Sequence, residues 1–474
     1  ANIRENDMKT KSFSAQGFPE GNFTRPSFAN SYPEGGKPGY AENKNRNANF
    51  YLNGGYVYDG RYLLDVNLRS DGTSVFGANK RFSTTWSVGL AWNVHREKFM
   101  KDKASFINVL KLRGSVGNPG NQNFSSYSAI TTYYFNNWML NNFGTGVLVS
   151  KFGDPNLAWQ RTLDKNIGIN LSMFSNRFHV TVDFYHKRTD PLIADIGIPV
   201  SMGVEKRRTN IGVQVDKGVN GTIRYAILYK PQESINYTMS VNFRYGTAFY
   251  KNIGRSLNAY NQENISKNLT RYYDGGSPTA LWAVRSRGID PATGQEIFVK
   301  KDGTLTYTFD YKDEVEVGDS RPTLEGVWGN TFYYKGWSAS LQLRYSFGAD
   351  VFNSTLFNKV ENISSRSITT NQDRRALYNR WKKPGDKAKF KSISLTESTP
   401  MSSRFVMKEN YLSIESVRLG YQFDSKWLKK ALRISSLNIN MYMNSIARFS
   451  TLEDERGLYY PFARSISFSL GAIL

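Results

Sequence analysis

The sequence predicts an all-β protein, an antiparallel transmembrane β-barrel, and three observations support this fold class. Hydrophobic and polar residues alternate one by one in many segments, which is the period of a β-strand and not of a helix. Short and long connections between these segments take turns along the chain, as in outer-membrane barrels. Aromatic residues make up 14% of the 474 residues and occur near the ends of the alternating segments. Strands with lipid on one side and water on the other explain all three.

The alternating segments occur along most of the chain. One face of the first clear example carries Trp86, Val88, Leu90, Trp92 and Val94, and the residues between them are small or polar. The pattern recurs at Ile235–Tyr245, Trp337–Phe347, Leu437–Met443 and Ile466–Leu474. Strands of about 10 residues exceed the roughly five or six that are usual in globular proteins. A soluble sandwich alternates too, so the pattern favours a barrel only together with strand length, aromatic ends and a polar second face.

The connections predict two different ends for the sheet. The short turns are Asp59-Gly60, Ser175–Arg177, Lys230–Ser234 and Lys335-Gly336. The long polar segments are Asn118–Asp164, Arg188–Asn210, Thr247–Leu324, Gly348–Asn410 and Ser445–Ala463. In an outer-membrane barrel the short connections are periplasmic turns and the long ones are outside loops.

The strand count predicts a part of a larger barrel. We count roughly thirteen strands, from about Ala48–Tyr58 to Leu474, whereas bacterial barrels have an even number. The first strand ends in a short turn, so we expect residues 1–46 to be an extracellular loop segment and residues 47–474 to be the C-terminal part of the barrel. The N-terminal part of the same barrel is then an expected partner.

The sequence contains no constellation for catalysis, so we expect neither an enzyme nor a cofactor. It has no cysteine, which excludes disulfides, thiol nucleophiles and Cys-ligated metals. His179 and His186 are seven residues apart on one predicted strand and therefore face opposite sides, and His95 lies at a strand end. Two acidic runs, at residues 313–316 and 453–455, offer carboxylates to calcium but lack the spacing of a calcium loop.

The formal net charge of +22 has two explanations that the sequence leaves open. Six basic residues fall on predicted lumen-facing positions: Arg69, Lys111, Arg113, Arg244, Arg344 and Arg418. Either the charge attracts an anionic ligand or lipid phosphates, or the balancing acidic groups belong to parts of the barrel outside this chain. Because no recognition motif accompanies the charge, we expect no nucleic-acid binding.

Aromatic residues of the long connections are the candidate ligand-binding groups. They are Tyr133, Tyr134, Trp138, Tyr272, Tyr273 and Trp282, with Arg285 nearby. Aromatic rings stack on sugar faces or apolar peptide groups, and polar neighbours supply directional hydrogen bonds. The alternative is that these rings fold the loops on themselves or form a partner interface.

Several blocks in order resemble the SusC/RagA-type TonB-dependent transporters of Bacteroidetes outer membranes. The most specific is Asp154-Pro155-Asn156-Leu157-Ala158-Trp159, followed by Asn166-Ile167-Gly168-Ile169 and Val182–Thr189. Further matches are Asn210-Ile211-Gly212, Asp216–Val219, Leu68–Ser74, Leu110–Ser115, Gly288–Gly294 and the ending Tyr460-Pro461 with Arg464.

This resemblance implies an outer-membrane barrel of 22 strands with a plug domain and a TonB box, both outside this chain. It implies import of a nutrient, an oligosaccharide or a peptide, together with TonB and a SusD-like surface lipoprotein. It also implies a Gram-negative, Bacteroidetes-type outer membrane as the location, and outer-membrane lipid as a contact. Two other functions stay open: a structural or docking subunit of an outer-membrane assembly or secretion complex, and a passive porin.

Overall fold

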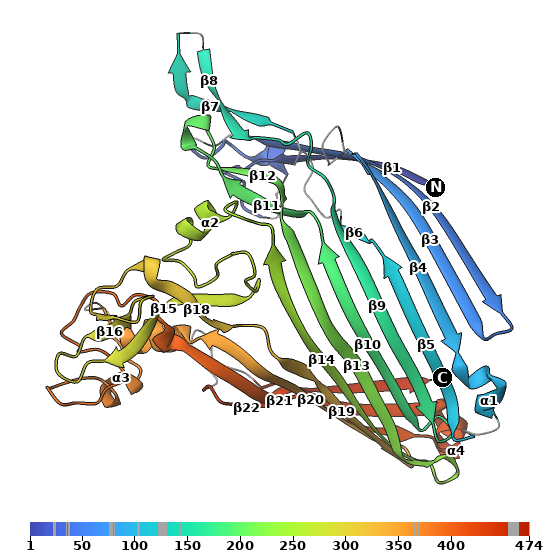
Figure 1. Ribbon diagram of the computed structural model, residues 1–474. Coiled ribbons are helices and arrows are strands. Elements are labelled where there is room, and N and C mark those ends of the chain that lie inside the picture. The colour runs from blue at the N-terminus through green and yellow to red at the C-terminus, as the bar shows by residue number, and fades with distance from the viewer. Residues whose placement is uncertain are drawn as a thin grey trace.

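The computed structural model consists mainly of one antiparallel sheet, drawn in Figure 1 as a curved wall. It describes residues 1–21, 25–34, 36, 38–74, 79, 81–101, 105–121, 130–142, 144–364, 366, 369–453 and 464–473. The main path of this 15-stranded sheet is β1 (Asn2–Ser12), β2 (Gly39–Tyr58), β3 (Tyr62–Thr73), β4 (Phe82–Asn93), β5 (Ile107–Gly117), β9 (Gln160–Met173), β10 (Phe178–Thr189), β13 (Val213–Lys230), β14 (Ile235–Lys251), β19 (Leu324–Tyr334), β20 (Trp337–Phe352), β21 (Val406–Phe423), β22 (Ser436–Ser450) and β23 (Ile466–Ile473). The two-residue strand β6 (Gly120–Asn121) pairs with β9 outside this path.

The all-β, antiparallel prediction is confirmed, with one addition near the N-terminus. Without β6 and β1, the main sheet contains the thirteen predicted strands. β1 lies inside residues 1–46, where we expected only loop, and β2 begins at Gly39 instead of near Ala48. Both segments are mainly polar, so they lack the apolar alternation that identified the other strands. Ion pairs across them join Glu5 to Lys44 at 2.7 Å and to Arg46 at 2.9 Å.

Smaller elements occupy the two ends of the sheet, as the alternation of connections predicts (Figure 1). The long connections contain the hairpins β7 (Thr132–Asn141)–β8 (Gly144–Lys151) and β11 (Leu192–Gly197)–β12 (Lys206–Ile211), and a four-stranded sheet of β15 (Ala280–Ile289), β16 (Glu296–Val299), β17 (Leu305–Thr306) and β18 (Glu314–Asp319). They also hold α2 (Asn258–Glu263) and α3 (Arg375–Tyr378). The opposite end, here the short-turn end, holds α1 (Lys98–Lys101) and α4 (Lys426–Leu432). Among the described residues, no helix has the length and apolarity to cross a membrane.

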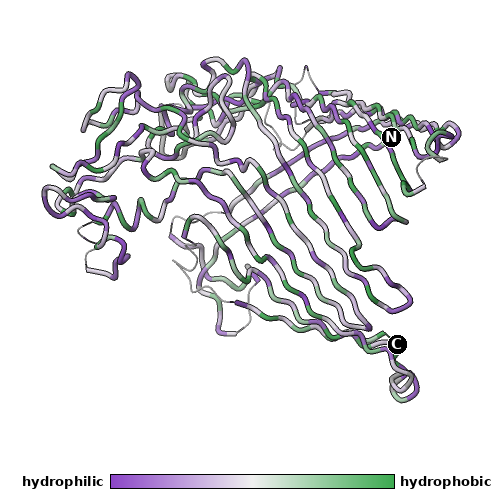
Figure 2. The backbone as a smooth tube through the Cα atoms, turned by 60° about the horizontal axis from the view of Figure 1, so that its bottom comes forward, coloured by the Kyte–Doolittle hydropathy of each residue, from purple (hydrophilic) through white to green (hydrophobic). Residues whose placement is uncertain are grey.

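One face of the main sheet, the apolar face, is exposed and hydrophobic across its strands. Leu90, Gly114, Ile167 and Phe184 are direct neighbours on β4, β5, β9 and β10. Leu90 is 61% exposed and Ile167 67%. Figure 2 shows hydrophobic and hydrophilic positions alternating along these strands. A continuous apolar surface of this kind is rare on soluble monomers and is typical of a surface that contacts lipid or another protein.

Aromatic residues follow one another across the strands at the short-turn end. Their rings form stacked, tilted or edge-on pairs with centroids 4.4–6.5 Å apart: Tyr58–Tyr62, Tyr62–Trp92, Phe106–Phe174, Phe178–Tyr225, Tyr237–Phe332, Phe332–Tyr334, Trp337–Tyr421 and Tyr421–Phe423. Such an aromatic girdle, a belt of aromatic side chains at the edge of an apolar band, is characteristic of transmembrane barrels, because aromatic side chains favour the membrane–water interface.

The described sheet is not closed. β1 and β23 are the two ends of its strand order, and neither has a second neighbour among the described residues. A wall with two free edges is consistent with a part of a barrel.

We predict that a charge at the centre of the apolar face destabilises the protein. Ile167→Arg should lower the free energy of unfolding by about 2–4 kcal/mol, because the charge enters the hydrocarbon layer. The measurement is denaturant unfolding of the full-length protein in lipid. Asn166→Arg, on the next residue and the opposite face, is the matched control and should cost less than about 1 kcal/mol. Equal losses for both variants would show that Ile167 does not face lipid.

Candidate functional site

The six basic residues predicted for the lumen all lie on the other face of the main sheet, here the polar face. The strand register shows this directly, since Arg113, Gly168, Asp183, Asn220, Arg244 and Glu325 are successive neighbours across β5, β9, β10, β13, β14 and β19. Arg69 faces Thr85 on β4, and Arg344 and Arg418 follow the same alternation on β20 and β21. Lys111 is two residues from Arg113 and shares its side of β5.

Most of this positive charge is balanced by neighbours on the same face. Four arginine–carboxylate pairs form there: Arg69–Asp71 at 2.7 Å, Arg113–Asp183 at 2.8 Å, Arg344–Glu415 at 3.2 Å and Arg244–Glu325 at 3.6 Å. Arg418 donates to Asn440 at 2.8 Å. For Lys111 no ion pair occurs within the described part of the chain. Four of these six cations thus have carboxylate partners in this chain, whereas the net charge of +22 already subtracts all 40 acidic residues, so both explanations of that excess stay open.

Gly168 allows one of these contacts, the Arg113–Asp183 pair, to span an intervening strand. Arg113 on β5 reaches across β9 to Asp183 on β10, and its path passes directly over Gly168. A Cβ at Gly168 would lie 2.5 Å from the Asp183 Oδ1 atom and 2.8 Å from the Arg113 Cζ atom, so a side chain there would displace the ends of both partners. The glycine of the Asn166-Ile167-Gly168 block thus has a structural reason.

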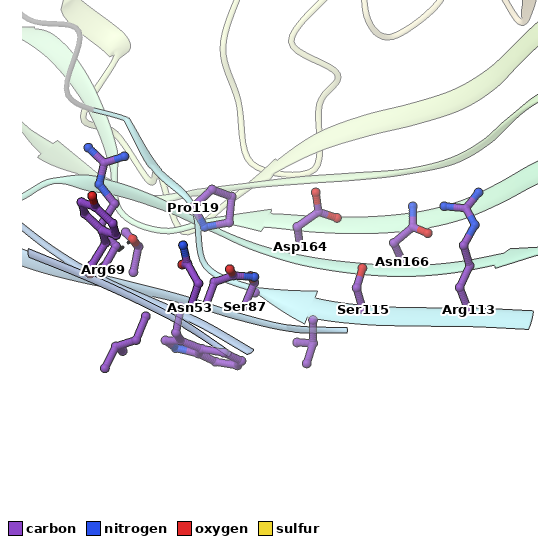
Figure 3. Close-up of a pocket in the computed structure, with 15 residues that line it drawn as sticks. Asn53, Arg69, Ser87, Arg113, Ser115, Pro119, Asp164 and Asn166 are labelled. Carbon is purple, nitrogen blue, oxygen red and sulfur yellow. Dashed lines mark hydrogen bonds between the residues drawn. The ribbon is translucent and has the colours of Figure 1, made fainter. Parts of the chain in front are cut away.

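A polar cavity of about 670 Å³ lies on this face between β2 and β9. In Figure 3 the labelled side chains of Arg69, Arg113, Ser115, Asp164 and Asn166 project to the same side of the sheet. The Oδ2 atom of Asp164 pairs with Lys187 at 3.3 Å, whereas its buried Oδ1 atom has no hydrogen-bond partner among the described residues. The side chains that line the cavity, among them Asn53, Arg69 and Asn166, include both hydrogen-bond donors and acceptors, as recognition of hydroxyl or amide groups requires.

The aromatic residues predicted to bind a ligand lie in different parts of the long connections. Tyr133 and Tyr134 are exposed on the β7–β8 hairpin, which projects from the loop end of the sheet (Figure 1). The side chain of Trp138 lies outside the described part of the structure. Tyr272 packs between Tyr250 and Tyr260, with ring centroids 5.7 and 5.5 Å away. Its position favours the loop-folding explanation over direct ligand contact.

Tyr273 and Trp282 are the two candidates that meet at a cavity. Their ring centroids are 4.7 Å apart, and both rings line a space of about 900 Å³ together with Lys301, Tyr311 and Lys312. The indole nitrogen of Trp282 has no hydrogen-bond partner among the described residues. Arg285 is exposed on β15 and is not part of this lining.

A buried ion pair forms one wall of this aromatic cavity. Arg271, only 1% exposed, donates to both carboxylate oxygens of Glu314 at 2.9 and 3.0 Å. Burial raises the pKa of the Glu314 carboxyl, and Arg271 opposes that rise. Glu314 belongs to the acidic run that we considered for calcium, and the structure gives its carboxylate an arginine as partner. No pattern in the sequence linked the two residues, which are far apart in the chain.

The two longest loops form one module through a second buried network. Arg404, which precedes β21, pairs with Glu296 of β16 at 2.8 Å and with Glu361 at 2.6 Å. Ser402 donates to Glu296 at 2.5 Å, and the backbone NH of Ser286 donates to Ser403 at 3.0 Å. These contacts join residues 252–323 to residues 353–405. The module therefore holds the aromatic cavity on a fixed support.

The Asp154–Trp159 block anchors the loop before β9. Leu157 and Trp159 are 1% and 2% exposed, so the block ends in two buried hydrophobic side chains. Asn210 uses both amide atoms on the backbone of Ala158, at 2.7 and 3.0 Å. Asp154 accepts from Thr209 at 2.9 Å. These hydrogen bonds attach the block to β12, so its role in the structure is to hold the loop in place and not to bind a ligand.

We predict that the buried network, and not surface charge, holds the loop module together. Arg404→Met should destabilise the module locally by about 3–5 kcal/mol, because it leaves Glu296 and Glu361 buried without their cation. Chymotrypsin cleavage of the folded full-length protein within residues 252–405 should become faster. Arg285→Met, at an exposed arginine, is the control and should leave the cleavage rate unchanged. Equal rates for the two variants would contradict this role of Arg404.

Comparison with known proteins agrees with this architecture. Residues 9–440 match the protein family described as TonB dependent receptor-like, beta-barrel. TonB-dependent receptor P39 of Formosa agariphila is 27% identical over 454 residues, covering 86% of this chain and 43% of the relative. TonB-dependent receptor SusC of Bacteroides thetaiotaomicron is 24% identical over 449 residues, covering 87% of this chain and 42% of the relative. The chain thus spans less than half the length of either.

A solved structure, that of the RagAB peptide transporter, has the same fold over nearly the whole chain. It superposes with a TM-score of 0.81 at 20% identity, covering 95% of this chain and 49% of the other. The SusC/RagA resemblance of the sequence blocks is thereby confirmed. The chain belongs to the TonB-dependent receptor-like β-barrel family and is similar to SusC and to the RagAB transporter.

Proposed function

We propose that this chain forms the C-terminal part of the barrel of an outer-membrane importer. The observation that carries the proposal is that the main sheet has two different faces. One is exposed and apolar and carries the aromatic girdle, and the other is polar and carries arginine–carboxylate pairs. That separation suits a wall between lipid and a water-filled lumen. Family membership adds energy from TonB, and the location is the outer membrane of a Gram-negative, Bacteroidetes-type bacterium.

The proposed cargo is a nutrient, an oligosaccharide or a peptide, captured together with a SusD-like surface lipoprotein. The RagAB structure, which this chain resembles, is that of a peptide transporter and supports a peptide, whereas the family resemblance of the sequence blocks implies a cargo of either kind. The loop module is a suitable support for capture, because its cavity combines the rings of Tyr273 and Trp282 with charged and polar neighbours. Stacking on an aromatic face suits sugar rings and apolar peptide groups alike.

The free edges of the described sheet, at β1 and β23, indicate that further strands pair with them. A lipid-embedded strand edge leaves backbone groups without hydrogen bonds, which is costly in hydrocarbon. We infer that β1 and β23 pair with the N-terminal part of the same barrel, and that outer-membrane lipid covers the apolar face. Contact with TonB belongs to the N-terminal part.

Removal of the aromatic cavity wall should weaken cargo capture. In the full-length protein, Trp282→Ala should lower the uptake rate at subsaturating nutrient by about tenfold, the equivalent of one stacking contact of roughly 1.4 kcal/mol. Tyr378→Ala removes a 71% exposed ring from α3 and serves as the control, with uptake unchanged. Uptake that is equally insensitive to both changes would remove Trp282 from the site.

The importer itself is tested by growth of a strain that lacks the full-length gene. On panels of oligosaccharides and peptides as sole nutrients, the deletion should abolish growth on one class. The full-length gene should restore growth, and a copy without its TonB-contacting segment should not. Restoration by that truncated copy would indicate a passive pore. Unchanged growth, with stoichiometric co-purification of assembly or secretion factors, would favour the structural subunit.

A further inference from the structure

The two helices at the short-turn end carry exposed cations next to exposed aromatic rings. α1 lies in the connection from β4 to β5, and α4 in the connection from β21 to β22 (Figure 1). Around α1, Arg96 and Lys98 are exposed, as is Phe99. On α4 and directly after it the exposed residues include Trp427, Lys429, Lys430 and Arg433. We call this set of seven residues the basic rim.

α4 is amphipathic over its short length. Lys429 and Lys430 lie on the helix, and Arg433 follows directly after its last residue, Leu432, with a left-handed backbone conformation (φ 56°). Trp427 and Ala431, four residues apart, share one side of the helix, and the Trp427 side chain is 67% exposed. A helix with cations on one side and an exposed tryptophan on another matches the helices that lie in the headgroup region of a membrane.

The cations of the basic rim differ from those of the polar face in their partners. Four arginines of the polar face have carboxylates of the same chain beside them. At the rim, Lys429 pairs with Asp424 at 3.5 Å. Within the described part of the chain, no carboxylate lies within 4.0 Å of Arg96, Lys98, Lys430 or Arg433. These four cations are therefore available to a negatively charged partner outside the described chain.

The position of the rim indicates which partner that is. The basic rim adjoins the aromatic girdle at the same end of the sheet. There Phe106 stacks on Phe174 beside α1, and Tyr421 packs on Phe423 just before α4. Aromatic rings mark the depth of the lipid headgroups in a membrane protein. Cations just beyond such rings reach lipid phosphates, and basic residues beside a membrane favour anionic lipids over zwitterionic ones.

We propose that α1 and α4 bind anionic phospholipid of the leaflet at the short-turn end. The recognised group is a lipid phosphodiester with net negative charge, held by the rim cations while Phe99 and Trp427 enter the interface. The proposal rests on the proposed position of the sheet in a membrane, and it adds a lipid preference that membrane embedding alone does not require.

The test measures which lipids stay bound to the full-length protein. The purified protein is offered equal amounts of phosphatidylglycerol and phosphatidylcholine in detergent, and native mass spectrometry counts the retained lipids. Wild type should retain phosphatidylglycerol preferentially. The variant Lys429→Gln/Lys430→Gln/Arg433→Gln should lose at least about fivefold of that preference. Lys429→Arg/Lys430→Arg should keep it, which separates charge from folding defects.

The matched control changes the same charge at the other end of the molecule. Lys382→Gln/Lys383→Gln/Lys387→Gln alters three exposed loop lysines and should leave the preference unchanged. An equal loss in this control would assign the preference to overall charge and overturn the proposal, as would full competition by inorganic phosphate. A protein that stays dispersed without detergent would instead contradict membrane embedding, whereas a detergent-dependent protein without lipid preference would refute only the rim.

Discussion

Strand register is the constraint on which the rest of the structure depends. Side chains alternate between the two faces of a sheet, so a slip of one residue between any two strands would exchange the faces of every strand beyond it. The row through Leu90, Ile167 and Phe184 would then turn inward, and arginines such as Arg113 would turn towards lipid. The ion pairs of the polar face reinforce the register, because Arg113 meets Asp183 only when β5, β9 and β10 are aligned as they are.

The loop end depends on burial rather than on register. Small hydrophobic clusters, such as the one around Val360 and Phe405, pack there beside buried ion pairs of Arg271 with Glu314 and of Arg404 with Glu296 and Glu361. Buried pairs contribute little net stability, but loss of one partner is costly, so they favour a single arrangement of the loops. The segments around the aromatic cavity of Tyr273 and Trp282 therefore have few alternative conformations. The proposed cargo site and the proposed lipid-binding rim thus lie at opposite ends of one wall.

Local patterns in the sequence predicted the wall but not the loop module. Period-two alternation is a property of neighbouring residues, so strands such as β4 and β20 could be placed from their own residues. β1 was missed because its residues are mainly polar. Glu415 could not be assigned a face, since it is the extra residue of a β-bulge in β21. The partners of Arg404 lie in other loops, and the sequence carries no periodic signal for contacts between loops.

The most direct test of the account measures which face of the sheet touches lipid. Single cysteines can be introduced along β9 and β10, in a full-length protein from which any other cysteine has been removed, and labelled with a fluorophore. Brominated lipids quench fluorophores that contact acyl chains. We expect strong quenching at positions 167, 169, 182 and 184 and little at 166, 170, 181 and 183. Equal quenching at both sets, or none at either, would contradict a wall with one face in lipid and the other in water.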